Sequence, residues 1–216
     1  MLSCQIDHLI LGINNLEKGC TDFENLSGVR PAFSGEHPNW GTHNALLSLE
    51  QSYLEVIAPQ PTMELAESPF SIIKDQIQLS LIGWAIQTTN LNEVIQLMDE
   101  FGLKHTERLS GSRKTPTGEM LRWESVFLLN ESTTSIHPFF IQWENPDLHP
   151  SKTTPKGCTL SDITIGDHSD SLLCNFLNKL SIPLKFQKGA KDKCGHLLEL
   201  ELNTPLGKLY LYDSIS

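Results

Sequence analysis

The sequence lacks three features that each mark a large class of proteins: a long apolar run, an excess of positive charge, and regularly spaced cysteines. No apolar run approaches the length that spans a bilayer. The chain of 216 residues has 16 basic and 26 acidic residues, a formal net charge of −10. A chain this acidic repels nucleic-acid phosphates and anionic membranes. We therefore expect no nucleic acid and no membrane among its partners, and instead a small-molecule substrate or ligand or a protein partner.

The five cysteines are an odd number, and none is spaced as Cys-x-x-Cys. Cys4, Cys20 and Cys174 fall in apolar or helical stretches, which is typical of reduced structural thiols and not of a disulfide framework. Asp7 and His8 interrupt the first apolar run, so the N-terminal residues do not have the form of a signal peptide. These features predict a cytoplasmic protein.

Several catalytic signatures are also missing. The chain has no Gly-x-Ser-x-Gly elbow, no Walker loop, no Gly-x-Gly-x-x-Gly and no His-Glu-x-x-His. These absences disfavour an α/β-hydrolase, a P-loop enzyme, a dinucleotide-dependent enzyme and a zincin protease. We expect no nucleotide cofactor.

What the sequence does have is an order of elements that recurs three times. Residues 5–13 form an apolar run typical of a strand, residues 16–26 carry apolar side chains at helical spacing, and three extended runs follow up to residue 58. The same β-α-β-β-β order begins again twice, at intervals of roughly 75 to 80 residues. The predicted organisation is a first unit over 1–58, a connection over 59–78, a second unit over 79–150, a linker over 151–157 and a third unit over 158–216.

This order predicts an α+β fold in which paired units leave a concave surface between them. In the second unit we expect extended runs at 103–109, 119–129 and 137–144, and we interpret the basic segment GSRKTPTG (111–118) as a loop.

Tandem units of this kind resemble the vicinal oxygen chelate superfamily. More narrowly, the segments DHLILGINNL, HPNWGTHNALLSLEQSYLEVIAP, GSRKTPTGEMLRW and PFFIQW resemble the glyoxalase-like domain group, over about residues 5 to 146. The resemblance implies tandem βαβββ modules that form curved, cup-shaped mixed sheets. It also implies one divalent metal (Zn, Mn, Fe, Ni or Co) held between two modules. The implied activity is that of a metal-dependent lyase, isomerase or dioxygenase-type enzyme acting on a small, oxygen-rich anionic compound.

His8 and Glu55 stand in the first and last strands of the first unit, where the superfamily has metal ligands. The resemblance thus implies a metal held by His8, Glu55 and His43, with catalytic roles for His43 and Glu55. The second unit departs from the pattern, because Gly83 takes the place of His8 and Gln142 falls at or near the place of Glu55. The missing ligands favour an alternative, a metal-free binding protein for sequestration or sensing on the same fold.

Arginine and aromatic side chains are the candidates for substrate binding. The planar guanidinium of arginine suits a carboxylate or phosphate, and aromatic side chains can form the walls of a cup. A structural ion pair for the arginines and plain core packing for the tryptophans stay open as alternatives. We expect His37 at the surface or in a lid, and His149 has no ligand spacing. The candidate substrate-binding residues are Asn44, Arg113, Arg122, Trp84, Trp123 and Gln142.

Two questions stay open in the sequence. A two-residue turn at Glu50-Gln51 would place Glu55 on the same face as Asn44, whereas a three-residue turn would place it on the face of His43. The third unit has no partner unit, so it either packs on the first two within the chain or meets its copy in a homodimer, which we slightly favour.

Overall fold

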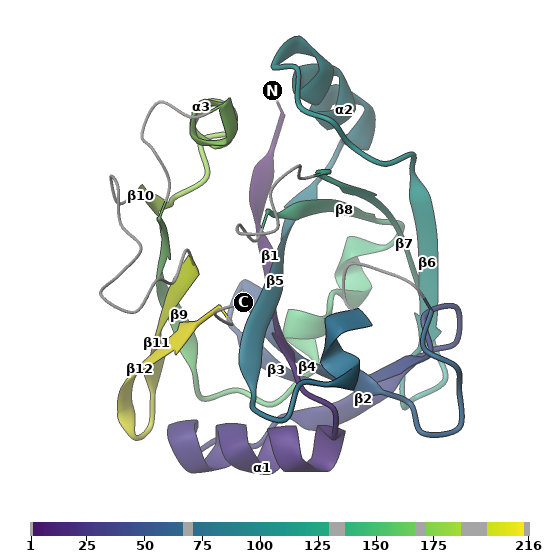
Figure 1. The fold of residues 1–216 in the computed structure, drawn as a ribbon, viewed down its shortest axis with the longest axis vertical. Helices are drawn as coiled ribbons and strands as arrows, with labels where there is room; N and C mark the ends of the chain where they lie inside the picture. Colours follow the sequence, from purple (N-terminus) through teal and green to yellow (C-terminus); the bar gives the residue numbers. More distant parts are fainter. Residues whose placement is uncertain (1, 67–70, 130–136, 167–171, 187–197, 214–216) are drawn as a thin grey trace.

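A computed structural model of the chain describes residues 2–66, 71–129, 137–166, 172–186 and 198–213. The first two units form one eight-stranded sheet in the order β2-β3-β4-β1-β5-β8-β7-β6 (Figure 1). The first unit consists of β1 (Cys4–Gly12), α1 (Leu16–Ser27), β2 (Ala32–His37), β3 (Thr42–Leu49) and β4 (Ser52–Pro59). The second unit consists of β5 (Ser80–Thr88), α2 (Leu91–Glu100), β6 (Leu109–Lys114), β7 (Met120–Phe127) and β8 (Phe139–Trp143).

Local signals set the ends of the first helix. The side chain of Asn15 accepts a hydrogen bond from the backbone N–H of Lys18 at 2.9 Å, which caps the start of α1. Gly28 ends the helix in the left-handed conformation, with φ at 80°. In the second unit Asn90 caps α2 in the same way, by accepting from the backbone N–H of Glu93. These caps and helices agree with the sequence pattern.

Strand pairing makes the two units alike. In each unit the first and last strands are parallel neighbours, β1 beside β4 and β5 beside β8. The antiparallel pair of β1 and β5 joins the units at the centre of the sheet. The predicted tandem βαβββ arrangement and curved mixed sheet are therefore confirmed for these two units.

The two edge strands of this sheet, β2 and β6, come together and nearly close it. The guanidinium of Arg113 on β6 donates a hydrogen bond to the backbone oxygen of Ser34 on β2 at 2.7 Å. A Cβ added at Gly35 would lie 2.8 Å from the backbone oxygen of Lys114, so the close approach of the two strands requires glycine there. The result is a cup whose inner face is enclosed by both units.

One predicted strand lies elsewhere. We expected an extended run at 103–109 and a loop at 111–118, but the strand is β6, Leu109–Lys114. It pairs antiparallel with β7 along its whole length, from Leu109 opposite Ser125 to Lys114 opposite Met120. Pairing with a neighbouring strand overrides the weak strand propensity of Gly and Ser here.

The third unit keeps the order of elements but not the pairing. It consists of β9 (Thr159–Ile165), α3 (Leu172–Lys179), β10 (Lys185–Phe186), β11 (Leu198–Thr204) and β12 (Gly207–Tyr212). Its four described strands lie in the order β10-β9-β11-β12, so within the described residues the first strand lies between two others and does not pair with the last. Element order alone does not specify which strands pair, so this unit is not a third copy of the module's topology.

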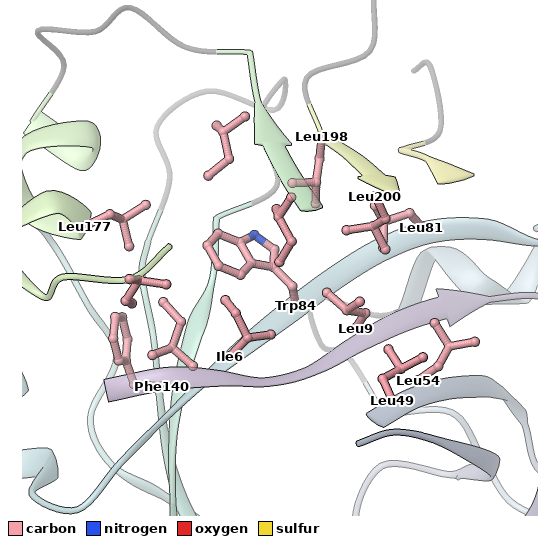
Figure 2. Packing of buried hydrophobic residues seen from close by; sticks show 14 of the residues in the cluster. Ile6, Leu9, Leu49, Leu54, Leu81, Trp84, Phe140, Leu177, Leu198 and Leu200 are labelled. Carbon is pink, nitrogen blue, oxygen red and sulfur yellow. The ribbon is translucent and has the colours of Figure 1, made fainter. Parts of the chain in front are cut away.

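The described part of the third unit packs within the chain, against the outer face of β1 and β5. Figure 2 shows Trp84 of β5 and Leu9 of β1 among leucines of the third unit, including Leu198 and Leu200. Phe176 of α3 is fully buried in the same cluster. An uncovered apolar face was our reason for favouring a homodimer, and the main sheet supplies that cover. Homodimerisation itself stays a prediction.

Four of the five cysteines lie in the described residues. Within the described residues Cys4, Cys20, Cys158 and Cys174 form no disulfide, and Cys194 lies outside the described residues. Burial raises the pKa of Cys20 to about 11, so this thiol is unreactive at neutral pH. Within the described ranges, no helix has both the length and the apolar character needed to cross a membrane.

Candidate functional site

A cavity of about 80 Å³ lies inside the cup. Strands of both units line it, and its walls are largely apolar and aromatic. Two histidines, an amide, a carboxylate and a guanidinium also reach it: His8, His37, Asn44, Glu55 and Arg113. The other lining residues are Ile10, Trp40, Thr42, Tyr53, Ile57, Trp123, Ser125, Phe127, Phe139, Ile141 and Trp143. Buried polar groups in an apolar cavity are the usual mark of a binding site.

The turn between β3 and β4 decides which residues face the cavity. Leu49 pairs with Ser52, so Glu50 and Gln51 form a two-residue turn, and Glu50 adopts a positive φ of 74°. In this register Glu55 lies opposite Leu46 and faces inward with Asn44. Of the two registers left open by the sequence, the structure has the two-residue turn.

Glu55 is 6% exposed and has two polar neighbours in the cavity. The Asn44 Nδ2 group donates a hydrogen bond to Glu55 Oε1 at 2.7 Å. The other oxygen, Oε2, lies 3.6 Å from His8 Nε2, too far for a direct hydrogen bond. These two atoms are close enough for a single ligand atom or water to contact both.

The carboxylate of Asp7 sits behind His8. Asp7 is an extra residue at a register shift between Ile6 and His8, and such a bulge re-aims a side chain. Asp7 is fully buried and accepts three hydrogen bonds, from His8 Nδ1 at 2.5 Å, Trp143 Nε1 at 2.8 Å and His149 Nε2 at 3.1 Å.

The environment of Asp7 assigns the tautomer of His8. Burial alone would raise the pKa of Asp7, but hydrogen bonds from His149 and His8 lower it to about 2. Asp7 is therefore ionised at neutral pH and can only accept. His8 Nδ1 must carry a proton, and the other ring nitrogen, Nε2, is the one that lies 3.6 Å from Glu55 Oε2. The ring of Tyr53 stacks on His8 with centroids 4.6 Å apart and holds it in place.

Arg113 supplies a buried positive charge from the second unit. Its side chain lines the cavity, and the residue is 5% exposed. Burial lowers the pKa of Arg113, while the nearby Tyr53 and Glu55 act in the opposite direction. Among the described residues no carboxylate lies within ion-pair distance of it, and its hydrogen bond there goes to the Ser34 carbonyl. A guanidinium with donors to spare in an apolar cavity is a site for an anion.

His37 lines the cavity, although we expected it at the surface or in a lid. Its Nδ1 lies 3.0 Å from Thr42 Oγ1, and its Nε2 lies 3.4 Å from Asn44 Nδ2. Loss of water contact lowers the pKa of His37. A neutral ring that accepts from Asn44 through Nε2 and donates to Thr42 through Nδ1 fits these contacts.

Four predicted site residues lie outside the cavity. Because side chains alternate along a strand, the register that turns Glu55 inward turns His43 to the opposite face, away from the cavity. Trp84 is turned outward in the same way and is fully buried under the third unit. Gln142 caps α2, since its Oε1 accepts from the Leu91 N–H at 2.7 Å. The side chain of Arg122 is 59% exposed on the outer face.

The other predicted residues, His8, Asn44, Glu55, Arg113 and Trp123, do line the cavity. The sequence analysis missed Asp7, His37 and His149. A charged residue within an apolar strand was a usable signal for Asp7, since such a group must be paired. Nothing near His149 in the sequence points to Asp7, because 142 positions separate the two residues.

The side chains in the cavity do not fit the metal-ligand set implied by the resemblance. His8 and Glu55 are placed as two ligands, but His43 is on the other face, and the second unit offers Gly83 and Ile141 at the corresponding strands. Within the described residues no three His, Cys, Asp or Glu side chains are grouped so that they could hold a metal ion. Catalytic metals are normally held by at least three protein ligands.

Comparison with known proteins agrees with the fold. A family profile described as a glyoxalase-like domain matches residues 6–180. A search of curated proteins finds no significant match. A hypothetical protein from Staphylococcus aureus of known structure is 17% identical, over 98% of this chain and 86% of that chain, with a TM-score of 0.65. A hypothetical protein from Bacillus halodurans C-125 is 18% identical, over 66% of this chain and 96% of that chain, with a TM-score of 0.51.

Methylmalonyl-CoA epimerase from Mycobacterium tuberculosis also resembles the chain, at 14% identity over 66% of this chain and 89% of that chain, with a TM-score of 0.48. At these identities the similarity extends to the fold and not to the reaction.

Proposed function

The chain belongs to the glyoxalase-like domain family, and from that premise we propose that its cavity binds a small carboxylate-bearing compound and moves a proton on it. The observation that carries this proposal is the meeting of three groups in one buried cavity. These are the Arg113 guanidinium, the His8 ring held by Asp7, and the Glu55 carboxylate held by Asn44. The first binds an anion, and the other two exchange protons.

Arg113 would bind the carboxylate of the substrate. A guanidinium forms two parallel hydrogen bonds with a carboxylate, and these are stronger where water is excluded. Apolar side chains surround the cavity, so an anion that enters loses its hydration and must recover it from Arg113. This requirement favours a compact anion over a neutral molecule of the same size.

His8 and Glu55 would move the proton. Asp7 accepts from His8 Nδ1, and in this arrangement it stabilises the ring when Nε2 gains a proton. Glu55 Oε1 is held by Asn44, which leaves Oε2 directed toward His8 Nε2 at 3.6 Å. Two such groups side by side can remove a proton from one atom of a bound molecule and return it to the next. That is the chemistry of an isomerase or a lyase.

We derive no step through a metal, because the residues present do not fit the implied ligand set. Elemental analysis tests this directly on protein purified without chelator, beside the variants His8→Ala and Glu55→Ala. We expect much less than one divalent metal ion per chain. Stoichiometric metal that disappears in both variants would contradict the proposal and restore the metal-dependent reaction.

A second candidate function is metal-free binding without catalysis, for sequestration or sensing. The apolar second-unit wall, with Phe139 and Ile141, favours it, because that wall contributes no proton-transfer group beside Arg113. Both candidates share anion binding at Arg113 and differ only in whether a proton moves.

Hydrogen exchange separates the two. Pyruvate and 2-oxobutanoate in D₂O would be followed by proton NMR with and without the protein. We expect faster loss of the proton signal at the carbon next to the carbonyl, and a rate about 100-fold lower for Glu55→Gln. Glu144→Gln, an exposed carboxylate on the outer face, is the matched control. Binding without any exchange would leave the binding protein as the answer.

The predicted homodimer and cytoplasmic location remain proposals. Light scattering of purified protein over a range of concentrations tests the first, and fractionation of cells that produce the protein tests the second.

A further inference from the structure

We infer that the ligand of this cavity carries a hydroxyl group as well as its carboxylate, and that Asn44 selects for this hydroxyl by accepting its hydrogen bond. The inference rests on the proposed binding of a carboxylate by Arg113. It adds the second polar group of the ligand and a residue that determines specificity.

The starting observation is an acceptor without a partner. Asn44 is 2% exposed and lines the cavity, and its Oδ1 has no hydrogen-bond partner among the described residues. Buried side-chain acceptors in native proteins almost always have a partner, because leaving one unpaired costs stability. A partner supplied by a ligand removes that cost and converts it into binding energy.

The identity of the unpaired atom follows from its neighbours. The amide nitrogen of Asn44 lies 2.7 Å from Glu55 Oε1 and 3.4 Å from His37 Nε2. A carboxylate only accepts hydrogen bonds, so exchanging the nitrogen and oxygen of Asn44 would set two oxygens against each other. The Glu55 carboxylate therefore keeps the amide nitrogen toward itself and leaves the oxygen for a donor.

The cation and the acceptors of the cavity lie near one another. Asn44 Oδ1 and Glu55 Oε2 belong to the neighbouring strands β3 and β4. Arg113 of β6 contacts β2 beside Gly35, the residue that pairs with Asn44. A complementary ligand has an anionic group and, a short distance away, an O–H donor. Because the cavity holds only about 80 Å³, the two groups must be separated by few atoms. These requirements together describe a small hydroxycarboxylate.

The test compares ligands that differ by one hydroxyl. Lactate, 3-hydroxypropanoate and propanoate would each be titrated into ¹⁵N-labelled protein, with the tryptophan indole N–H signals as the readout. Trp40, Trp123 and Trp143 line the cavity, whereas Trp84 lies on the other face of the sheet and serves as an internal control. We expect at least one hydroxy acid to bind about 10-fold more tightly than propanoate, with shifts confined to the cavity tryptophans.

The variant Asn44→Ala assigns the preference to this residue. We expect it to reduce the ratio of hydroxy acid to propanoate affinity to about one. Asn203→Ala, which removes an exposed asparagine side chain on β11 of the third unit, should leave the ratio unchanged. The dispersion of the NMR spectrum shows whether each variant is folded.

The outcomes separate this inference from the function it rests on. Equal affinity for all three acids, lost in Arg113→Gln, would overturn the role of Asn44 but keep carboxylate binding. A preference that survives in Asn44→Ala would do the same. If none of the acids shifts a cavity tryptophan, the proposed function fails together with the inference. Stoichiometric metal that is lost in Asn44→Ala would also overturn the inference, because the free oxygen would then be a metal ligand.

Discussion

The two halves of the cup have the same strand pairing and opposite chemistry. In the first unit the inner faces of β1, β3 and β4 present His8, Asn44 and Glu55. In the second unit β5 has Gly83 opposite Ile10, β8 presents Phe139 and Ile141 to the cavity, and the only charged group among its described lining residues is Arg113. Strand pairing depends on the backbone, so it tolerates this difference, whereas the proposed proton transfer would depend on a few side chains of the first unit.

Residues of the second unit and of the segment after it also hold the polar groups of the first unit in place. Asp7 accepts hydrogen bonds from Trp143 at the end of β8 and from His149, the residue that directly follows the short helical turn Pro146–Leu148. The apolar half thus contributes by fixing the polar half. The following predictions, from the largest expected effect to the smallest, test this division of roles.

Replacing Asp7 by asparagine should have the largest effect. The amide cannot accept hydrogen bonds from all three donors, and its own N–H groups would face N–H groups of Trp143 and His149. We expect the free energy of unfolding to fall by about 3 to 5 kcal/mol, measured by urea denaturation. Asp147→Asn, whose side chain is 95% exposed, is the matched control and should change stability by less than about 0.5 kcal/mol.

The same carboxylate should make stability depend on acid pH. The folded-state pKa of Asp7, about 2, lies below its unfolded value. Its contribution is therefore fully present above about pH 5 and is lost as pH falls through the folded-state pKa to about pH 1. We expect wild type to lose about 2.5 kcal/mol over the whole of this window through Asp7 alone. Urea titrations at several pH values check this, and an equal loss in Asp7→Asn would contradict it.

Arg113→Gln should abolish most anion binding. It removes the cavity's positive charge and keeps a side chain able to donate to the Ser34 carbonyl. We expect the affinity for lactate, measured by NMR titration, to fall about 30-fold, the loss of a charge-assisted hydrogen bond. Arg122→Gln should have no effect, since that side chain is exposed on the outer face. Similar losses in both variants would show that general charge, and not the cavity, binds the acid.

The smallest effect is expected at His43. We expect His43→Ala to leave both hydrogen exchange and lactate binding unchanged, because its side chain does not line the cavity. His8→Ala should reduce exchange at the same time, and an NMR rate measurement on the two variants side by side checks both. A large loss in His43→Ala would mean that the register of β3 differs from the one described.

Much of the fold could be predicted from the sequence. The run around His8, the helix between Asn15 and Gly28, and the alternation that ends in Glu55 all mark their elements locally. The strand at 109–114 could not be predicted, because its Gly and Ser residues have weak strand propensity and are held by pairing with β7. The strand pairing in the third unit could not be predicted either, because the same order of elements along the chain is compatible with more than one order of strands in the sheet.

The site divides in the same way. His8 and Glu55 were found because their places in the strands match a known pattern, and Arg113 because a basic residue stands out in an acidic chain. The sequence could not predict which side chains face the cavity. A turn longer or shorter than Glu50-Gln51 by one residue would place His43, and not Asn44, on the same face as Glu55.

By itself, the sequence determined the family, the repeated order of elements, and a first unit richer in chemistry than the second. Only the tertiary structure decided that Trp84 lies in the core, that His149 reaches Asp7, and that Asn44 Oδ1 is left without a partner. The physical reason is the distance along the sequence over which each interaction acts. Strand and helix signals depend on neighbours a few residues away, whereas these contacts join segments up to 142 residues apart. Such contacts exist only once the sheet has curled and β2 has met β6.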